Sequence, residues 1–248
     1  MKWYEMTTEE FGRLVDEKTL VVVPFGILEE HGPHLPLGTD TIQVLHLVDM
    51  VEEELEKKGI KTVVAPPVHY GQSNSTRAFP GTISIKAETL YMLTKDILLE
   101  IVRQGMKNIV LISGHAGSQH MKAIERAANE IVEADASEDL KMMVLSDYHI
   151  AYQLLGKMGI PEDDGHAGTI ETARVFEVRE DLVRKEKIKD IKASKPFPKF
   201  RILKHPEKYI PDGVIGEPPL PNSLGMGKEI NSYILNKLLQ LIFQMLEQ

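Results

Sequence analysis

The stretch TLVVVPFGILEEHGPHLPLGTDT, residues 19–41, joins two kinds of sequence. Its first seven residues are almost all apolar and rich in valine, a composition typical of a strand buried on both faces of a sheet. The residues that follow, 26–41, hold two glutamates, two histidines and an aspartate among glycines and prolines. In open parallel sheets, ligands bind beyond the carboxyl ends of the strands, so this loop is placed to carry functional groups.

Apolar strand-like runs and helix-like segments alternate after this stretch. Continuous apolar strands separated by helices predict a parallel sheet that is covered on both faces by helices. Before the stretch, Thr7 and Glu10 have the spacing of a helix-capping box. The expected strands are 19–25, 61–67, 107–113 and 141–147, and the expected helices between them are 41–58, 86–104 and 119–134.

The pattern changes from Asp163 onward. A short helix is expected at about Thr169–Phe176, followed by an irregular, proline-rich stretch and a final amphipathic helix at about Lys228–Leu246. We find no linker or repeat, so we expect a single domain, 1–248, whose C-terminal third from about residue 184 is irregular. Its basic segment, 184–204, is either a solvated surface or a wall that attracts an anionic substrate.

Composition narrows the class of protein. The chain has 248 residues, of which 42% are hydrophobic and 27% charged, as in an ordinary globular protein. It has no cysteine, which excludes thiol catalysis and thiolate metal ligands and fits a reducing compartment. We see no signal peptide and no run of about 18 apolar residues, so we expect a cytoplasmic protein without a membrane span. The net charge of −8 argues against general binding of nucleic acid.

Side chains that bind metals follow three of the predicted strands: Glu29, His31 and Asp40 after the first, His115 after the third, and Asp147 and His149 after the fourth. Parallel strands end at one edge of a sheet, so we expect these groups to converge. Carboxylates and imidazoles without thiolates suit zinc, manganese or iron(II). A set of several carboxylates and histidines, with one group able to bridge, suits a hydrolytic site with two metals.

Each candidate also has a purely structural explanation. Asp40 could cap the helix expected from Thr41, and His115 could be a turn residue between glycines. Glu171 could be an acid that favours the dipole of the short helix. His166, just before that helix, is a candidate proton carrier because its unperturbed pKa lies near neutrality. The joint placement of these residues favours a functional site.

Two other classes of protein remain open. A nucleotide-binding α/β protein would place phosphate at a helix N-terminus, and SGHAGSQ, residues 113–119, could do so. However, the chain has neither G-x-G-x-x-G nor G-x-x-x-x-G-K-[ST]. A catalytically inactive scaffold would be expected to have lost part of its carboxylate–histidine set, which is complete here.

Residues 26–41 closely resemble the signature of the creatininase (creatinine amidohydrolase) family, G-x-x-E-Q-H-G-P-H-L-P-L-x-T-D. FPGTIS (79–84), ISGHAGSQ (112–119) and HAGTIETA (166–173) are similar to further blocks of that family in the same order, and the resemblance covers most of residues 20–180. It implies a three-layer α/β/α sandwich with a mainly parallel central sheet. It also implies a metal-dependent hydrolase that cleaves a C–N bond of cyclic amide or formamide type.

The resemblance also implies cofactors and roles. Two divalent metal ions per chain are expected, zinc first, with manganese or iron as alternatives, together with a small-molecule substrate and a homo-oligomer, a hexamer. Asp40 would bridge the ions, and His166 would act as catalytic base or proton shuttle. Gly117 stands where creatininase itself has a glutamate, so Glu171 is expected to supply that acid as a ligand and catalytic residue. The implied metal ligands are Glu29, His31, Asp40, His115 and Glu171.

The chain departs from the family signature at two places. Glu30 stands where many members have glutamine, and STRAFPGT lacks the histidine that many members have before FPGT. We therefore expect weak or absent turnover of creatinine. The family also includes a formamide hydrolase, a peptidase and a ring-opening hydrolase of keto-inositols, so a peptide or a keto-cyclitol ring is an alternative substrate.

Overall fold

A four-stranded sheet of order β2-β1-β3-β4 forms the centre of the protein. The structure is a computed structural model and describes residues 1–136, 139–195 and 205–247. Every pair of neighbouring strands is parallel, as the sequence predicts. The strands are β1 (Leu20–Phe25), β2 (Thr62–Val64), β3 (Asn108–Ser113) and β4 (Lys141–Ser146).

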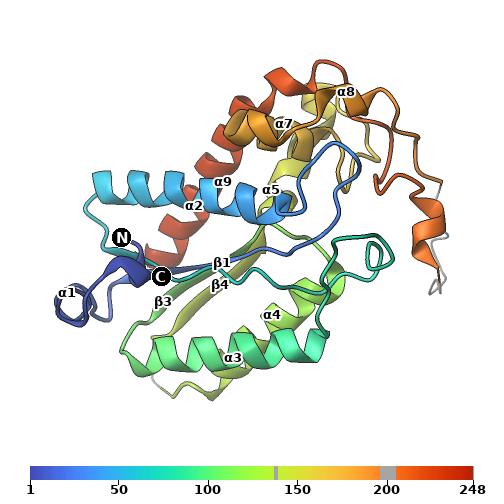
Figure 1. The fold of residues 1–248 in the computed structure, drawn as a ribbon. Helices are drawn as coiled ribbons and strands as arrows, with labels where there is room; N and C mark the ends of the chain where they lie inside the picture. Colours follow the sequence, from blue (N-terminus) through green and yellow to red (C-terminus); the bar gives the residue numbers. More distant parts are fainter. Residues whose placement is uncertain (137–138, 196–204, 248) are drawn as a thin grey trace.

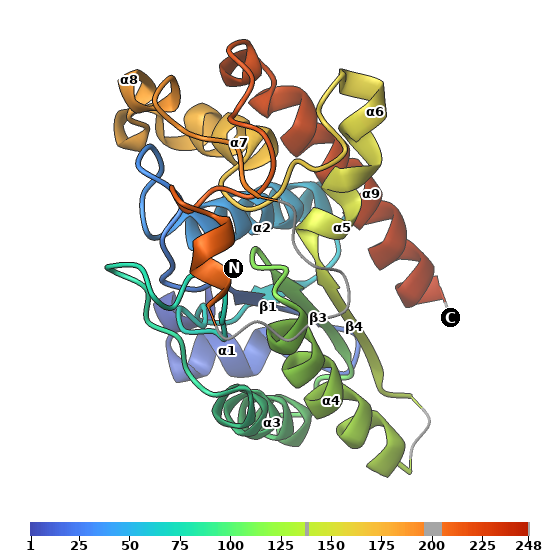
Figure 2. The ribbon, with the colours of Figure 1, turned by 90° about the vertical axis from the view of Figure 1, so that its right-hand side faces the viewer.

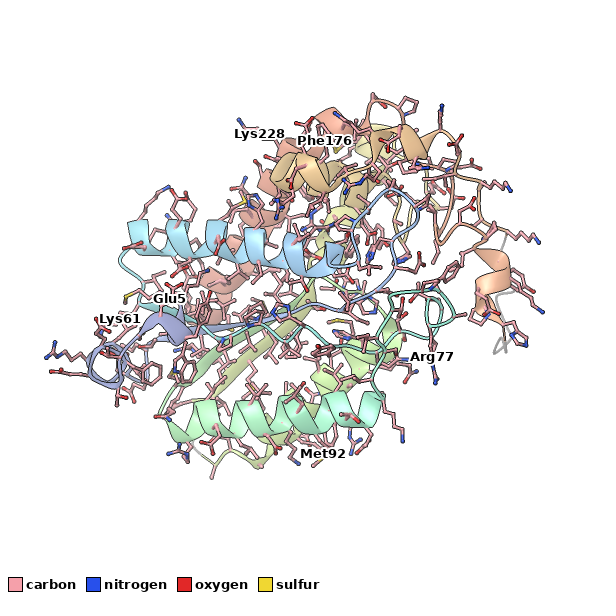
Figure 3. All side chains as sticks on the ribbon, in the orientation of Figure 1. Glu5, Lys61, Arg77, Met92, Phe176 and Lys228 are labelled. Atoms are coloured by element: carbon pink, nitrogen blue, oxygen red, sulfur yellow. The ribbon has the colours of Figure 1, made fainter. Side chains whose placement is uncertain are left out.

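Helices cover both faces of this sheet (Figure 1). The side chains of β1 alternate between the two faces of the sheet. Val22 packs in one hydrophobic cluster with one set of helices, and Val21 and Val23 pack in another cluster with a second set. Figure 3 shows side chains filling both layers against the sheet. The fold is therefore the expected three-layer α/β/α sandwich. The first set is α2 (Thr39–Lys57), α5 (Asp147–Ala151), α7 (Thr169–Arg179) and α9 (Gly227–Glu247), and the second is α3 (Ala87–Arg103) and α4 (Ser118–Ala134).

Shorter elements complete the described chain. Helix α1 begins after Thr7, whose side chain and that of Glu10 form the predicted capping box. Within residues 180–226, the structure describes only short helical turns, as expected for an irregular region, while residues 196–204 of the basic segment lie outside the described part. The short elements are α1 (Thr8–Leu14), α6 (Leu155–Met158), α8 (Lys185–Ile188), η1 (Trp3–Glu5), η2 (Tyr152–Leu154), η3 (Glu180–Leu182), η4 (Pro206–Tyr209) and η5 (Ser223–Gly225).

The strands end in register, and this alignment positions the functional loops. Phe25 pairs with Ser113, and Ser113 pairs with Ser146, so β1, β3 and β4 all stop at the same edge. Figure 2 looks onto the molecule from the side where the loop after β1 approaches α7. The loops after these three strands therefore begin at one edge of the sheet, as the strand order predicts. No helix of the described residues has the length and apolar character needed to cross a membrane.

Glycines let helix α2 close onto this edge. A Cβ atom on Gly114 would lie 2.2 Å from the backbone oxygen of Asp40, and one on Gly26 would lie 2.2 Å from the Thr41 Oγ1 atom. Only residues without a side chain permit so close an approach. The helix begins at Thr39, two residues before the expected start, so Asp40 lies in its first turn and over the ends of the strands.

Candidate metal centre

Five buried side chains meet beyond the carboxyl edge of the sheet, and they are the five predicted ligands. Asp40 Oδ1 lies 3.0 Å from His31 Nε2, and Asp40 Oδ2 lies 3.2 Å from His115 Nδ1. His115 Nδ1 is also 3.0 Å from Glu29 Oε2, and His31 Nε2 is 3.6 Å from Glu171 Oε2. None of these residues is more than 8% exposed.

The five side chains form two overlapping groups with the geometry of metal ligands. One group is Glu29, Asp40 and His115, and the other is His31, Asp40 and Glu171; within each, the ligand atoms lie within 4.8 Å of one another. Asp40 belongs to both groups and turns one oxygen toward each histidine. This is the arrangement of a carboxylate that can bridge two ions.

Hydrogen bonds from neighbouring groups orient the candidate ligands. His31 Nδ1 donates to the Glu29 carbonyl at 3.0 Å, and His115 Nε2 donates to the Gln72 carbonyl at 3.2 Å. Each imidazole therefore directs its other nitrogen into the cluster, as metal-binding histidines commonly do. The Thr76 hydroxyl donates to Glu29 Oε1, which leaves Oε2 facing His115.

The cluster holds three carboxylates and two imidazoles, so even protonated histidines would leave it with a net negative charge. Glu29 Oε2 and Asp40 Oδ2 are buried and accept no hydrogen bond from the described residues. A buried carboxylate without compensation is costly, so these oxygens fit a bound cation. Three carboxylates and two imidazoles are also the donor types that divalent zinc, manganese or iron accepts.

The neighbouring carboxylates also raise the pKa values of the two histidines. Burial lowers the pKa of His31, but the carboxylates of Asp40 and Glu171 outweigh burial and raise it to about 10. Burial opposes the effect at His115 as well, yet Glu29 and Asp40 raise the pKa of that imidazole well above its ordinary value. Protons or metal ions must balance the carboxylates.

His166 lies beside the cluster on the loop before α7. Its Nε2 donates to the Glu30 carbonyl at 2.7 Å, and its ring centroid is 4.3 Å from that of His31. The next residue, Ala167, has a φ of 55°, an uncommon conformation for a residue with a side chain. This turn lets the Ala167 N–H donate to Glu171 Oε2. The same turn therefore positions His166 and Glu171.

Asp147 and His149 do not join the cluster, contrary to the expectation from their place after the fourth strand. Asp147 begins α5 and is fully buried, where its Oδ2 accepts a hydrogen bond from Arg174 at 2.6 Å. Arg174 is itself fully buried on α7 and needs this counter-charge. His149 is exposed.

His120, which no motif in the sequence marks, lies behind the candidate ligand His115. The Gln72 N–H donates to His120 Nδ1 at 3.3 Å, and His120 Nε2 donates to Ser113 Oγ at 3.2 Å. Ser113 Oγ donates in turn to the His115 carbonyl at 2.7 Å. The Gln72 carbonyl accepts from His115 Nε2. His120 therefore hydrogen-bonds to Gln72 and Ser113, the two residues that hydrogen-bond to His115. The contact with Gln72 could not be read from a local pattern, because the two residues are 48 positions apart in the chain.

A cavity of about 340 Å³ opens onto the cluster. Glu29, His115, His166 and Glu171 all line it, so a molecule in the cavity can reach three of the candidate ligands and His166 together. Its size is that of a pocket for a small molecule or the end of a longer one.

These features define an α/β sandwich whose sheet edge carries a buried carboxylate–histidine site suited to divalent metal. A sequence model described as "Creatininase: Creatinine amidohydrolase" matches residues 4–242. The chain belongs to the creatininase family and is a hydrolase of that family, as the sequence predicts.

Known proteins agree with this assignment. The mycofactocin precursor peptide peptidase of Mycolicibacterium smegmatis is 33% identical over 168 residues, which cover 66% of this chain and 60% of that protein, less than two thirds of its length. The creatinine amidohydrolase of Pseudomonas putida is 28% identical over 200 residues, or 75% of each chain.

Solved structures show the same fold. A crystal structure of creatinine amidohydrolase matches with a TM-score of 0.81 at 26% identity and covers 98% of this chain and 96% of its own. Two more creatininase structures, each 24% identical over 98% of this chain and 97% of theirs, have TM-scores of 0.82 and 0.76 and are described as a manganese form and a zinc–zinc form.

Proposed function

We propose that this protein is a hydrolase that holds two divalent metal ions and cleaves a C–N bond of cyclic amide or formamide type. The observation that carries the proposal is the sharing of Asp40 between two ligand groups. Zinc is the first choice of ion and manganese or iron the alternatives, since manganese and zinc occur in the related structures. The ligands would be Glu29, His31, Asp40, His115 and Glu171.

The metal ions and His166 would contribute different steps of the hydrolysis. When bound, such ions supply a nucleophilic water at neutral pH and polarise the carbonyl under attack. His166 donates from Nε2 to the Glu30 carbonyl, which leaves Nδ1 to take a proton and return it to the leaving nitrogen. The carboxylates of Glu29, Glu30 and Glu171 favour a positive charge on His166 and oppose the effect of burial, which lowers its pKa.

A peptide is the second candidate substrate, supported by the likeness to the mycofactocin precursor peptide peptidase. A keto-cyclitol ring stays a third. Binding of a nucleotide has less support, because carboxylates line the cavity beside the turn after β3 and would repel phosphate. Stabilisation by ATP or NAD but not by divalent metal would favour that class instead.

The proposal is tested by metal analysis of gently purified protein followed by a substrate panel. We expect close to two ions per chain, and turnover of at least one member among cyclic amides, formamides, short peptides and keto-cyclitols. Creatinine should be hydrolysed slowly or not at all. Less than about one ion per chain, together with no gain in activity on adding Zn²⁺ or Mn²⁺, would overturn the proposal.

We also propose a single domain that assembles as a cytoplasmic homo-oligomer, a hexamer, on the basis of the family likeness. Native mass spectrometry measures this directly. A monomer at micromolar concentration would contradict it without affecting the metal centre.

A further inference from the structure

The second histidine of residues 26–41, His34, has no part in the proposed chemistry. It is fully buried and does not line the cavity, although it follows the candidate ligand His31 by only three residues. Its Nε2 atom lies 2.8 Å from Thr172 Oγ1, which is 138 positions further along the chain. A buried side-chain hydrogen bond therefore joins the loop after β1 to helix α7, which lie side by side in Figure 2.

The contacts of the Thr172 hydroxyl determine the direction of this hydrogen bond. Thr172 Oγ1 donates its own proton to the Gly168 carbonyl at 2.7 Å, so it accepts from His34. Burial, with a contribution from the nearby His31 and His166, lowers the pKa of His34 to about 4, so its ring is neutral at neutral pH. His34 therefore carries its one ring proton on Nε2, and its Nδ1 atom has no hydrogen-bond partner within the described chain.

This hydrogen bond reaches the turn that carries two candidate site residues. Gly168 immediately precedes α7, and its carbonyl accepts from both the hydroxyl and the N–H group of Thr172, at 2.7 and 3.0 Å. His166 lies two residues before Gly168, and Glu171 is the residue before Thr172. The link from His34 through Thr172 to Gly168 therefore spans the first turn of α7.

The segment around His34 is itself packed in place. The His34 carbonyl accepts from the Arg184 N–H at 2.8 Å. The next residue, Leu35, packs in a buried apolar cluster with Ala167 and Val175. Residues 34 and 35 are thus docked against α7 and the chain that follows it, which gives the imidazole a fixed place from which to donate.

We infer that His34 is a positioning residue, which acts through Thr172. It holds the first turn of α7, and with it His166 and Glu171, against the loop that carries the candidate ligand His31. The inference rests on the proposed function for what the positioned residues do, whereas the contact itself does not depend on it. His34 lines no part of the cavity and belongs to none of the ligand groups, so its effect passes through the position of α7.

Hydrogen exchange of the purified protein, without added metal or substrate, tests the contact. His34→Leu keeps a side chain of similar volume and removes the donor, so we expect the backbone amides of residues 167–172 to exchange about ten-fold faster. His34→Gln has an amide nitrogen at a similar distance from the backbone and should restore most of the protection. Thr172→Val should also speed exchange, and His34→Leu should add little to it, because both changes remove one shared bond.

A matched control lies on the other face of the sheet. Thr94 in α3 is as fully buried as Thr172, and its hydroxyl donates to the Leu90 carbonyl, four residues earlier, at 2.8 Å. Thr94→Val therefore removes the same kind of bond within a helix and should leave exchange of residues 167–172 unchanged. Wild-type exchange in His34→Leu, equal losses in His34→Leu and His34→Gln, or the same effect from Thr94→Val would refute the inference.

Zinc affinity tests whether the contact positions the metal centre. Glu171 belongs to one of the two ligand groups, so His34→Leu should weaken one zinc ion by about ten-fold and leave the other near the wild type. His34→Gln should bind both ions nearly as the wild type does. Faster exchange with unchanged zinc affinity would refute the positioning role. If the wild type binds no zinc, the proposed function fails instead, and the exchange experiment alone decides whether His34 holds α7.

Discussion

Asp40 has two interpretations that the contacts distinguish. A helix-capping aspartate accepts from backbone N–H groups of its own helix. Here both carboxylate oxygens face imidazoles instead, at 3.0 Å from His31 and 3.2 Å from His115, and Gly38 occupies the capping position. The side chain therefore serves the cluster.

Replacing Asp40 gives the first prediction. Asp40→Ala should abolish both metal retention and activity while the chain still folds, because both proposed ion positions lose their shared ligand. The measurement is metal content by mass spectrometry together with circular dichroism. A helix cap alone would give a loss of only ~1 kcal/mol in the free energy of unfolding with metal content intact, and that result would exclude the bridging role.

Glu171 tests the second ion position. Its Oε2 lies 3.6 Å from His31 Nε2 and accepts from the Ala167 N–H, whereas an acid that only favours the helix dipole would be indifferent to metal. Glu171→Gln keeps the shape and removes the charge. We expect one ion retained, one lost or much weakened, and activity strongly reduced. Retention of both ions with unchanged affinity would show that Glu171 is not a ligand.

His120 gives a prediction about a residue that acts through His115. Removing its ring nitrogens in His120→Phe should weaken metal affinity by about 10- to 100-fold, as for other partners of metal ligands. His120→Asn can still accept from the Gln72 N–H, so its metal affinity should lie nearer to that of the wild type. If the two variants lose metal affinity equally, or if both bind metal as the wild type does, His120 does not position His115.

The predictability of the site differs between residues. Glu29, His31 and His115 lie in loops that follow strand ends, so the strand pattern could predict that they converge. Glu171 lies in α7, which follows no strand, and its place in the cluster could be expected only from the family resemblance. Asp147 occupies an equivalent position in sequence, yet its side chain points into the helical layer, where Arg174 binds it. The sequence could not predict this pairing, since it depends on how α5 packs against α7 and α9.

At the level of elements, the approach of α2 to β3 fixes the cluster. A Cβ atom at position 114 would overlap the backbone oxygen of Asp40 at 2.2 Å and would also meet Val44 at 3.2 Å. Both contacts involve the rigid start of the helix, which cannot turn aside as a flexible side chain could. The spacing between strand end and helix thus depends on Gly114.

Gly114→Ala should therefore displace the start of α2 and weaken metal binding, although position 114 supplies no ligand side chain. The matched control is Gly12→Ala in α1, where an added Cβ meets nothing within 4 Å. We expect the control to keep wild-type metal content and to be slightly more stable, since alanine favours a helix by up to ~1 kcal/mol. Full metal content in Gly114→Ala would contradict this role of the close approach.

Boundaries of elements were harder to predict than their order. Strands β1, β3 and β4 lie inside the expected ranges, because continuous apolar runs mark buried parallel strands. Helix α7 continues to Arg179, beyond the expected end near Phe176, and α2 begins earlier than expected. These ends depend on contacts with other parts of the chain, such as the packing of Gly114 against Asp40, which a local pattern does not contain.

Across the whole molecule, the cluster joins parts that are far apart in the chain. Glu29 and His31 follow β1, Asp40 belongs to α2, His115 follows β3, and Glu171 lies in α7. Without ions, the three carboxylates repel one another and are balanced only by protonated histidines. Metal ions bound among them would therefore hold the loops and α7 to the sheet, and metal binding would contribute directly to the stability of the fold.

The last prediction concerns this coupling of metal binding to folding. Removing metal with a chelator should lower the midpoint of thermal unfolding, and adding back Zn²⁺ at about 100 times its dissociation constant should restore about 2.7 kcal/mol per site. For a chain of 248 residues, each kcal/mol corresponds to roughly 2–4 °C, so a shift of about 5–10 °C is expected for one site. Asp40→Asn, which keeps the shape of the side chain, should remove most of the shift. The same midpoint with and without metal in the wild type would mean that the cluster does not bind metal in the folded protein.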